Sequence, residues 1–221
     1  EVNDAVVAAR EVSVNPNDSW VNRHITYTHG YGLVVAHTNQ VTPAGDPEFM
    51  LENIPTRGVL ADDSTYEPRI YFGEFSPIYS VVGAPEGAAP RELDRPQDSD
   101  ADAETNYTFS GDGGPSVGNL LNRLVYAIKF QSTELLLSQD VNEESQILYD
   151  RHPAQRVQQV APYLEIDSTV YPAIVDGRVK WIVDGYTTSN DFPYSTSQSL
   201  DSAIQDSLNR GEFRPAGQVN Y

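Results

Sequence analysis

The chain has 221 residues, of which 39% are apolar, with 13 Tyr and 2 Trp but no Cys. This composition indicates a folded globular domain and excludes disulfides, thiolate catalysis and thiolate metal sites. A formal net charge of −18 at pH 7 argues against nucleic acid and anionic lipid headgroups as partners, because the field of the protein would repel their phosphates.

The first forty residues predict two strands and a short helix. Residues 5–14 and 33–36 have the composition of strands, and Asp18 or Ser19 can cap a helix that includes His24. No run approaches the roughly 18 to 20 apolar residues that a membrane helix needs. Because the chain starts abruptly inside a strand, we expect it to be a piece of a longer protein.

Turn-forming residues dominate the next part of the chain. Residues 38–68 predict loops with short elements, followed by strands at 69–74 and 78–83. Residues 84–106 are rich in Pro, Ala, Asp and Glu, which predicts a long, flexible acidic loop.

The second half predicts helices and a hairpin. A helix is expected over 119–130 and another from Pro153 to just before Pro162, and Asp176-Gly177 predicts a turn between strands 171–176 and 178–184. A last amphipathic segment covers 200–208. The aliphatic stripe of the first helix is expected to face the core: Leu120, Leu121, Leu124, Val125 and Ile128.

Hairpins and separate helices, without regular alternation of strand and helix, predict an α+β fold. We expect one domain over 1–221, built from a mixed or antiparallel sheet, a few packed helices and long loops.

Gly114-Pro115-Ser116-Val117-Gly118 matches the elbow pattern of serine hydrolases. Pro115 stiffens that turn, however, and glycines replace the strand end that should precede it. Ser116 is therefore predicted to be a turn or cap residue.

Two patterns raise the question of a metal. Asp98, Asp100 and Asp102, followed by Glu104, superficially resemble a calcium loop, but the Gly and the final Glu of an EF-hand are missing, so a solvated acidic loop is expected. Zinc requires three or four convergent ligands, which the sequence does not show around His29, so this histidine is expected to be a hydrogen-bonded structural residue. No cofactor is predicted.

Tyrosine-rich segments can line a groove, since aromatic faces with hydroxyl tips suit saccharides or peptides. Packing of the same rings in the core is the alternative. The candidate ligand-binding residues are His29, Tyr31, Tyr71, Glu74, Asp184, Tyr186, Asp191 and Tyr194.

Several longer motifs occur in order along almost the whole chain. They are WVNRH (20–24), YTHGYG (27–32), PRIYFGE (68–74), YSVVG (79–83), ILYDR (147–151), VAPYL (160–164) and WIVDGYTTS (181–189). In these motifs the chain resembles uncharacterised protein family UPF0182, and its sequence at 83–88 and 175–181 is similar to that of actinobacterial members.

The resemblance implies a large bacterial membrane protein, with several N-terminal transmembrane helices followed by a long extracytoplasmic region of which this chain is the first part. It implies location at the cell membrane and contact with the protein's own transmembrane region, but no activity. Where many members have Asp-Pro-Tyr-Pro, this chain has Thr169-Val170-Tyr171-Pro172, which puts a role for that aspartate, such as ion binding, in doubt; Asp167 lies nearby.

Three hypotheses follow. The first is a non-catalytic binding or assembly module at the cell envelope, with an envelope glycan or another envelope protein as a further partner. The second is a glycan-cleaving envelope hydrolase that uses two of Glu74, Asp184 and Asp191 in a tyrosine-lined cleft. The third is a structural spacer without a ligand.

Overall fold

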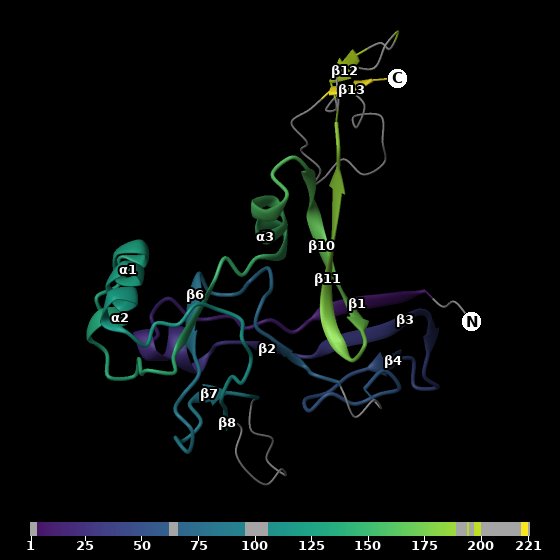
Figure 1. The fold of residues 1–221 in the computed structure, drawn as a ribbon. Coiled ribbons are helices and arrows are strands. Elements are labelled where there is room, and N and C mark those ends of the chain that lie inside the picture. The colour runs from purple at the N-terminus through teal and green to yellow at the C-terminus, as the bar shows by residue number, and fades with distance from the viewer. Residues whose placement is uncertain are drawn as a thin grey trace.

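The computed structural model describes residues 4–61, 66–95, 106–188, 194, 197–199 and 218–220, which form an α+β fold (Figure 1). In chain order the elements are β1 (Ala5–Ala9), η1 (Asn22–Thr26), β2 (Gly30–Tyr31), β3 (Leu33–Val41), β4 (Pro47–Leu51), β5 (Arg69–Ile70), β6 (Tyr79–Val82), β7 (Glu92–Leu93), β8 (Asn106–Tyr107), α1 (Leu120–Phe130), α2 (Glu134–Leu137), β9 (Gln146–Tyr149), α3 (Pro153–Val160), β10 (Glu165–Val175), β11 (Arg178–Tyr186), β12 (Ser197–Ser199) and β13 (Gln218–Asn220). The predicted fold class is confirmed.

The described strands form several small antiparallel sheets and not one large sheet. β1, β3 and β4 form a three-stranded sheet, and the other strands pair as β2–β5, β6–β9, β7–β8, β10–β11 and β12–β13. Figure 1 shows α1 and α2 at one end of the molecule, β4 at the other, and the β10–β11 hairpin standing beside β1 and β3.

The β10–β11 hairpin forms as its sequence predicts. Asp176 and Gly177 both have positive φ angles, 53° and 70°, as a tight two-residue hairpin turn requires. Along β11, the half-buried Val179, Trp181 and Val183 alternate with exposed residues, so this face covers the protein.

The buried apolar residues form two clusters. The first lies where η1, β6, β9 and α2 meet, and consists of Ile25, Tyr79, Val81, Val117, Leu135, Val141 and Ile147. The second joins β3, β4 and β5 to the hairpin and consists of Leu33, Val35, Leu51 and Ile70.

Helix α1 begins and ends close to the predicted residues, but its orientation differs from the prediction. The Asn119 side chain caps it by accepting a hydrogen bond from the backbone N–H of Asn122 at 2.8 Å. Tyr126, Ala127 and Phe130 pack against the first cluster, where the Phe130 ring stacks on Tyr79 and the Tyr126 ring contacts that of Tyr149. The expectation that the aliphatic stripe faces the core is therefore wrong.

The prediction of loops over 38–68 is also wrong in part. β3 extends to Val41 and pairs with β4, and a tight turn joins them, with the Thr42 N–H donating to the Asp46 carbonyl at 2.8 Å. The turn-forming residues at 43–46 thus mark one hairpin turn between two strands.

Strands that are neighbours in sequence do not always pair with each other. β5 and β6 follow each other in sequence but pair with β2 and β9, respectively. In the stretch expected to be one acidic loop, β7 and the buried Glu92 form part of the fold. Asp98, Asp100, Asp102, Glu104 and the segment 200–208 lie outside the described residues.

Within the described ranges, no helix combines the length and the apolar character needed to cross a bilayer.

Candidate functional site

Two of the predicted site residues, His29 and Tyr71, meet at a buried carboxylate. Their ring centroids lie 4.7 Å apart. Glu92, which is 3% exposed, accepts hydrogen bonds at 2.8 Å from the Tyr71 hydroxyl and from the Thr28 hydroxyl. Burial and the neighbouring Glu92 carboxylate raise the pKa of Tyr71, so its hydroxyl stays protonated and keeps donating.

A second carboxylate, Asp94, completes this cluster. Arg69 Nε donates to Asp94 Oδ1 at 2.6 Å, and His29 Nε2 lies 3.5 Å from the same oxygen. Burial alone would raise the pKa of Asp94, but the His29 and Arg69 groups outweigh it and lower that pKa. Burial and Asp94 together raise the pKa of Tyr31. His29, Tyr31 and Tyr71 thus belong to one charged cluster around Glu92 and Asp94.

The other predicted residues do not converge on that cluster. Glu74 is partly buried, and burial together with the Glu11 carboxylate raises its pKa. Asp184 and Tyr186 lie on β11, at the end remote from the hairpin turn, and Tyr194 is fully exposed. Asp191 lies outside the described residues.

Ser116 has the structural role that its sequence context predicts. Its Oγ accepts the Gly118 N–H at 3.2 Å, within the turn that precedes α1.

Four pockets among the described residues each contain a single carboxylate residue: Glu134, Glu67, Asp150 and again Glu134. A glycosidase needs two carboxyl groups on opposite sides of its substrate, and these four pockets do not provide such a pair. Across the described residues, no group of three or more His, Asp or Glu side chains is arranged to hold a metal ion.

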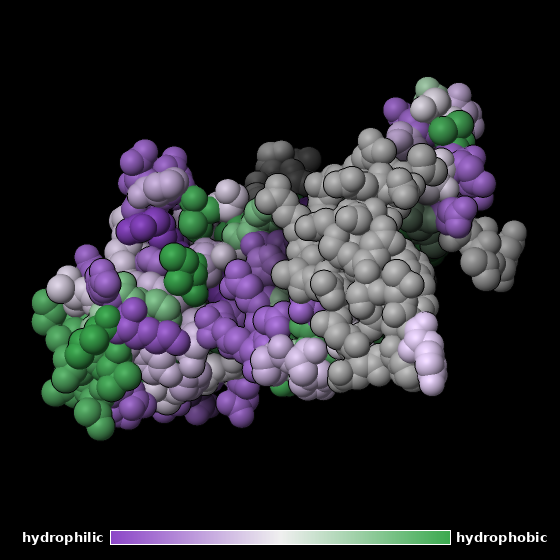
Figure 2. Space-filling model, turned by 90° about the horizontal axis from the view of Figure 1, so that it is seen from above, coloured by the Kyte–Doolittle hydropathy of each residue, from purple (hydrophilic) through white to green (hydrophobic). Residues whose placement is uncertain are grey.

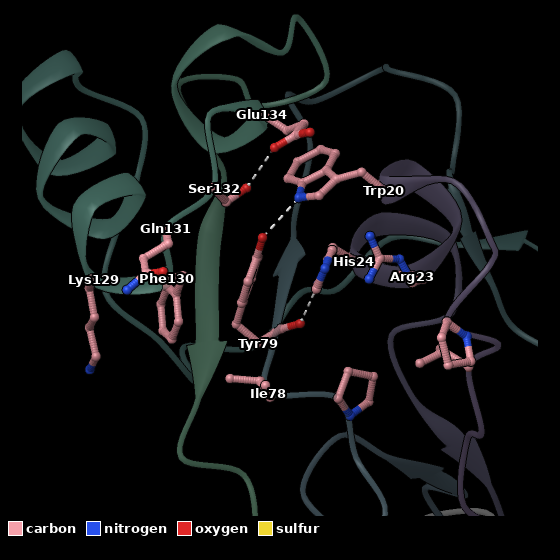
Figure 3. Close-up of a pocket in the computed structure, with 13 residues that line it drawn as sticks. Trp20, Arg23, His24, Ile78, Tyr79, Lys129, Phe130, Gln131, Ser132 and Glu134 are labelled. Atoms are coloured by element: carbon pink, nitrogen blue, oxygen red, sulfur yellow. Dashed lines mark hydrogen bonds between the residues drawn. The ribbon is translucent and has the colours of Figure 1, made fainter.

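The largest of these pockets, about 640 Å³, lies between η1, β6, α1 and α2 (Figure 3). We call it the aromatic pocket. Its lining residues are Val14, Pro16, Trp20, Arg23, His24, Pro77, Ile78, Tyr79, Lys129, Phe130, Gln131, Ser132 and Glu134.

Hydrogen bonds and ring stacking fix the wall of the aromatic pocket. Trp20 Nε1 donates to the Tyr79 hydroxyl at 2.8 Å, and His24 Nδ1 donates to the Tyr79 carbonyl at 2.9 Å (Figure 3). The rings of His24 and Tyr79 stack with centroids 4.0 Å apart, and Phe130 stacks on Tyr79 at 4.6 Å. Desolvation lowers the pKa of His24, so it is neutral at pH 7 with Nε2 as an acceptor.

Two cationic residues, Arg23 and Lys129, are part of the pocket lining. Lys129 Nζ lies 3.7 Å from the ring centroid of Tyr149, beside the pocket. The Arg23 side chain makes neither a hydrogen bond nor an ion pair with any described residue, and its Nε is buried. Glu134, another lining residue, accepts a hydrogen bond from the Ser132 hydroxyl at 3.1 Å. In an acidic protein, this pocket therefore carries a local excess of positive charge.

Next to the pocket, the stripe formed by Leu120, Leu121, Leu124, Val125 and Ile128 lies on the surface, with each side chain 43–71% exposed. We call it the α1 apolar face. Figure 2 shows the corresponding hydrophobic patch at the helical end of the molecule. On the neighbouring α2, Leu137 is 75% exposed.

The family model described as "Uncharacterised protein family (UPF0182)" matches residues 1–221. The chain belongs to this family.

Curated UPF0182 relatives are much longer than the chain. The chain is 63% identical over 223 residues to a UPF0182 protein of Micrococcus luteus, and this alignment covers 100% of the chain and 21% of that protein. The corresponding protein of Paenarthrobacter aurescens is 58% identical over 230 residues, covering 100% and 23%. The chain thus spans about a fifth of these relatives. No solved structure matches it.

Most residues that line the aromatic pocket of this UPF0182 chain are not predicted to be site residues from the sequence. Tyr79 belongs to the tyrosine-rich segments expected to line a groove, but His24 is predicted only as a helix residue and Phe130 only as the end of the helix over 119–130. The signal that could have suggested them is the spacing of Trp20, Arg23 and His24, which places three large side chains within about one helical turn.

Proposed function

We propose that this domain is a non-catalytic binding and assembly module of a larger bacterial cell-envelope protein. It docks through the α1 apolar face onto another part of its own polypeptide. The observation that carries the proposal is the exposure of five aliphatic side chains on one face of a single helix.

The physical argument starts from the cost of leaving this face in water. Covering a half-exposed aliphatic side chain contributes about 1–2 kcal/mol, so five of them on one face favour association strongly. Contiguous apolar patches on otherwise polar proteins mark interaction sites, and this patch lies on a protein with a net charge of −18.

The rest of the same polypeptide is the occupant that the observations favour. About four fifths of each relative lies outside the matched region. A partner on the same chain has an effective concentration in the millimolar range, so a modest apolar contact suffices. A bilayer rich in anionic lipid is disfavoured by the charge of the domain. The family resemblance, which implies a membrane protein with an extracytoplasmic region, supports a place at the cell envelope.

The test compares the isolated domain with a full-length protein. A chimera is made in which this chain replaces the matching region of the Micrococcus luteus relative. The variant of the chimera carries both Leu121→Gln and Ile128→Gln. We expect faster proteolysis of the α1 region in the full-length chimera, because docking no longer protects it. In the isolated 221-residue chain, the same pair should change the free energy of unfolding by less than about 1 kcal/mol, since both side chains are already exposed.

Val41→Gln is the matched control, because Val41 is an exposed aliphatic residue at the far end of β3. It should leave proteolysis of the chimera unchanged. Equal proteolysis of the parent chimera and the α1 variant would contradict docking onto the same polypeptide, and binding of the isolated domain to neutral vesicles would identify lipid as the occupant instead.

A further inference from the structure

We propose that the aromatic pocket is a binding site for a small organic anion that carries a carboxylate on an apolar body about the size of one aromatic ring. This is a ligand function separate from docking through the α1 apolar face.

The size and the walls of the pocket suit such a body. Its volume of about 640 Å³ falls within the range of about 300–1,000 Å³ that is typical of small-molecule sites. Trp20, Pro77, Ile78 and Phe130 all line the pocket, so an inserted ring would meet apolar surface from several residues. A ligand with only a charged group would leave this surface in water.

The wall is preformed. The Tyr79 ring is held between His24 and Phe130, while Trp20 and His24 are bonded to the hydroxyl and carbonyl of the same tyrosine. Side chains that are already fixed lose little conformational entropy when a ligand binds, which favours affinity.

Arg23 provides the anion-binding group. A buried nitrogen without a hydrogen-bond partner lowers the stability of a protein. Arg23 Nε is such a nitrogen, since it has no hydrogen-bond partner among the described residues. A guanidinium presents a planar fork of donors that fits a carboxylate with two parallel hydrogen bonds. A carboxylate on the ligand would satisfy this unused capacity, and Lys129 adds a second positive charge at the same pocket.

The backbone at this point is unusual. η1 is a π-helix, in which the Tyr27 N–H donates to the Asn22 carbonyl five residues earlier, at 2.9 Å. Single π-helical turns occur frequently at functional sites. Here the turn holds Arg23 and His24 side by side at the pocket (Figure 3).

The two tryptophans make the test specific. Trp20 lies in the pocket, whereas Trp181 lies on β11 and donates its indole N–H to the Phe72 carbonyl at 2.6 Å. In the ¹⁵N-labelled 221-residue chain, each indole N–H gives one NMR signal. Titration with N-acetyl-phenylalanine should shift the Trp20 signal in a saturable manner and leave the Trp181 signal in place.

Three probes separate the two parts of the ligand. The primary amide of N-acetyl-phenylalanine keeps the ring but lacks the charge, and should bind at least about tenfold more weakly, as expected for the loss of a charge-assisted hydrogen bond. Acetate keeps the charge but lacks the ring and should not saturate the shift.

Arg23→Gln should remove the preference for the acid over the amide, whereas Arg57→Gln, an identical change at an exposed position outside the pocket, should preserve it. Lys129→Gln should reduce the preference less than Arg23→Gln does. The unchanged Trp181 signal reports that each variant is folded. Absence of a Trp20 shift, equal affinity for acid and amide, or an Arg23→Gln variant with unchanged preference would overturn the proposal.

The outcome is independent of the docking proposal. Leu121→Gln with Ile128→Gln changes the α1 apolar face and not the pocket lining, and should leave the affinity for N-acetyl-phenylalanine unchanged.

Discussion

Glu92 shows how a carboxylate is accommodated inside this acidic protein. Its Oε2 accepts from two hydroxyls, those of Thr28 and Tyr71, and its Oε1 accepts from the backbone N–H of Phe109 at 2.9 Å. Hydrogen bonds to an ionised group in the interior are strong because little water screens them. The region that the sequence suggested to be an acidic loop thus supplies one of the main polar contacts of the interior.

Removing one donor from this carboxylate should be costly. We expect Tyr71→Phe to lower the free energy of unfolding by about 1.5–3 kcal/mol, because a charged acceptor loses a buried hydrogen bond while the ring remains. Denaturant unfolding measures the change. Tyr163→Phe removes the same hydroxyl from an exposed ring and should have an effect within about 0.5 kcal/mol, so equal effects of the two substitutions would refute the role assigned to Tyr71.

His24 gives the protein a pH dependence in the weakly acidic range. Desolvation lowers its pKa in the folded protein, whereas the unfolded chain titrates near the ordinary value of about 6.5. Below that pH the unfolded state binds the proton first, so stability is full above about pH 6.5 and falls as the pH drops toward the folded pKa.

The measurement is the difference in unfolding free energy between the parent and His24→Gln from pH 7.5 to pH 5. The parent should lose stability more steeply than the variant, since only the parent has to protonate this imidazole. Parallel profiles would show that the folded protein does not suppress the protonation of His24.

At the scale of elements, α1 depends on a cap at its first turn. The Asn119 side chain satisfies the Asn122 N–H, which has no partner within the helix. We expect Asn119→Ala to lower the free energy of unfolding by about 1 kcal/mol and Asn119→Asp to preserve it, because aspartate can accept the same hydrogen bond. Thermal unfolding of the two variants checks this, and an alanine variant as stable as the aspartate variant would contradict it.

Elements whose signals are local were predictable. The Asp176-Gly177 turn, Pro153 at the start of α3 and the alternation along β11 depend on neighbouring residues only, and all three are confirmed. The orientation of α1 was not predictable, because periodicity shows which residues share a face but not what covers that face.

The candidate site was predictable only in fragments. His29 and Tyr71 are candidates from the sequence and their rings do meet, but Glu92, which accepts the Tyr71 hydroxyl, lies in a stretch predicted to be a loop. Trp20 and Tyr79 are bonded across 59 residues, and a contact of that kind leaves no pattern in one sequence.

At the scale of the whole molecule, one buried cation joins the two apolar clusters. Arg151 donates to the Tyr71 carbonyl and the Ser80 hydroxyl, both at 2.6 Å, and to the Thr28 carbonyl. Burial lowers the pKa of Arg151 to about 10, so it remains charged at neutral pH. Ser80 lies between Tyr79 and Val81 of the first cluster, and Tyr71 directly follows Ile70 of the second.

Arg151→Met should therefore weaken the cooperativity of unfolding as well as the stability. We expect a loss of about 2–4 kcal/mol, because three carbonyl or hydroxyl acceptors lose a charged donor in the interior. Trp20 packs on the first cluster and Trp181 on the second, so single-tryptophan versions of the protein, made with Trp181→Phe or Trp20→Phe, follow each cluster separately.

In the parent background, the two fluorescence transitions should coincide, whereas in Arg151→Met they should separate. Arg91→Met, which removes a surface pair with Asp140, should cost less than about 1 kcal/mol and keep the transitions together. Coincident transitions in Arg151→Met would show that the clusters are coupled by other contacts.

The hydrogen bond between Arg151 and Thr28 can form only after a delay during synthesis on the ribosome. It spans 123 residues, and ribosomes add about 5–20 residues per second. Roughly 6–25 seconds therefore pass between the translation of Thr28 and that of its partner. During this interval β6 lacks its partner β9 and has an open edge, which is the kind of surface that chaperones cover. The domain consequently completes its fold only after most of it has been translated.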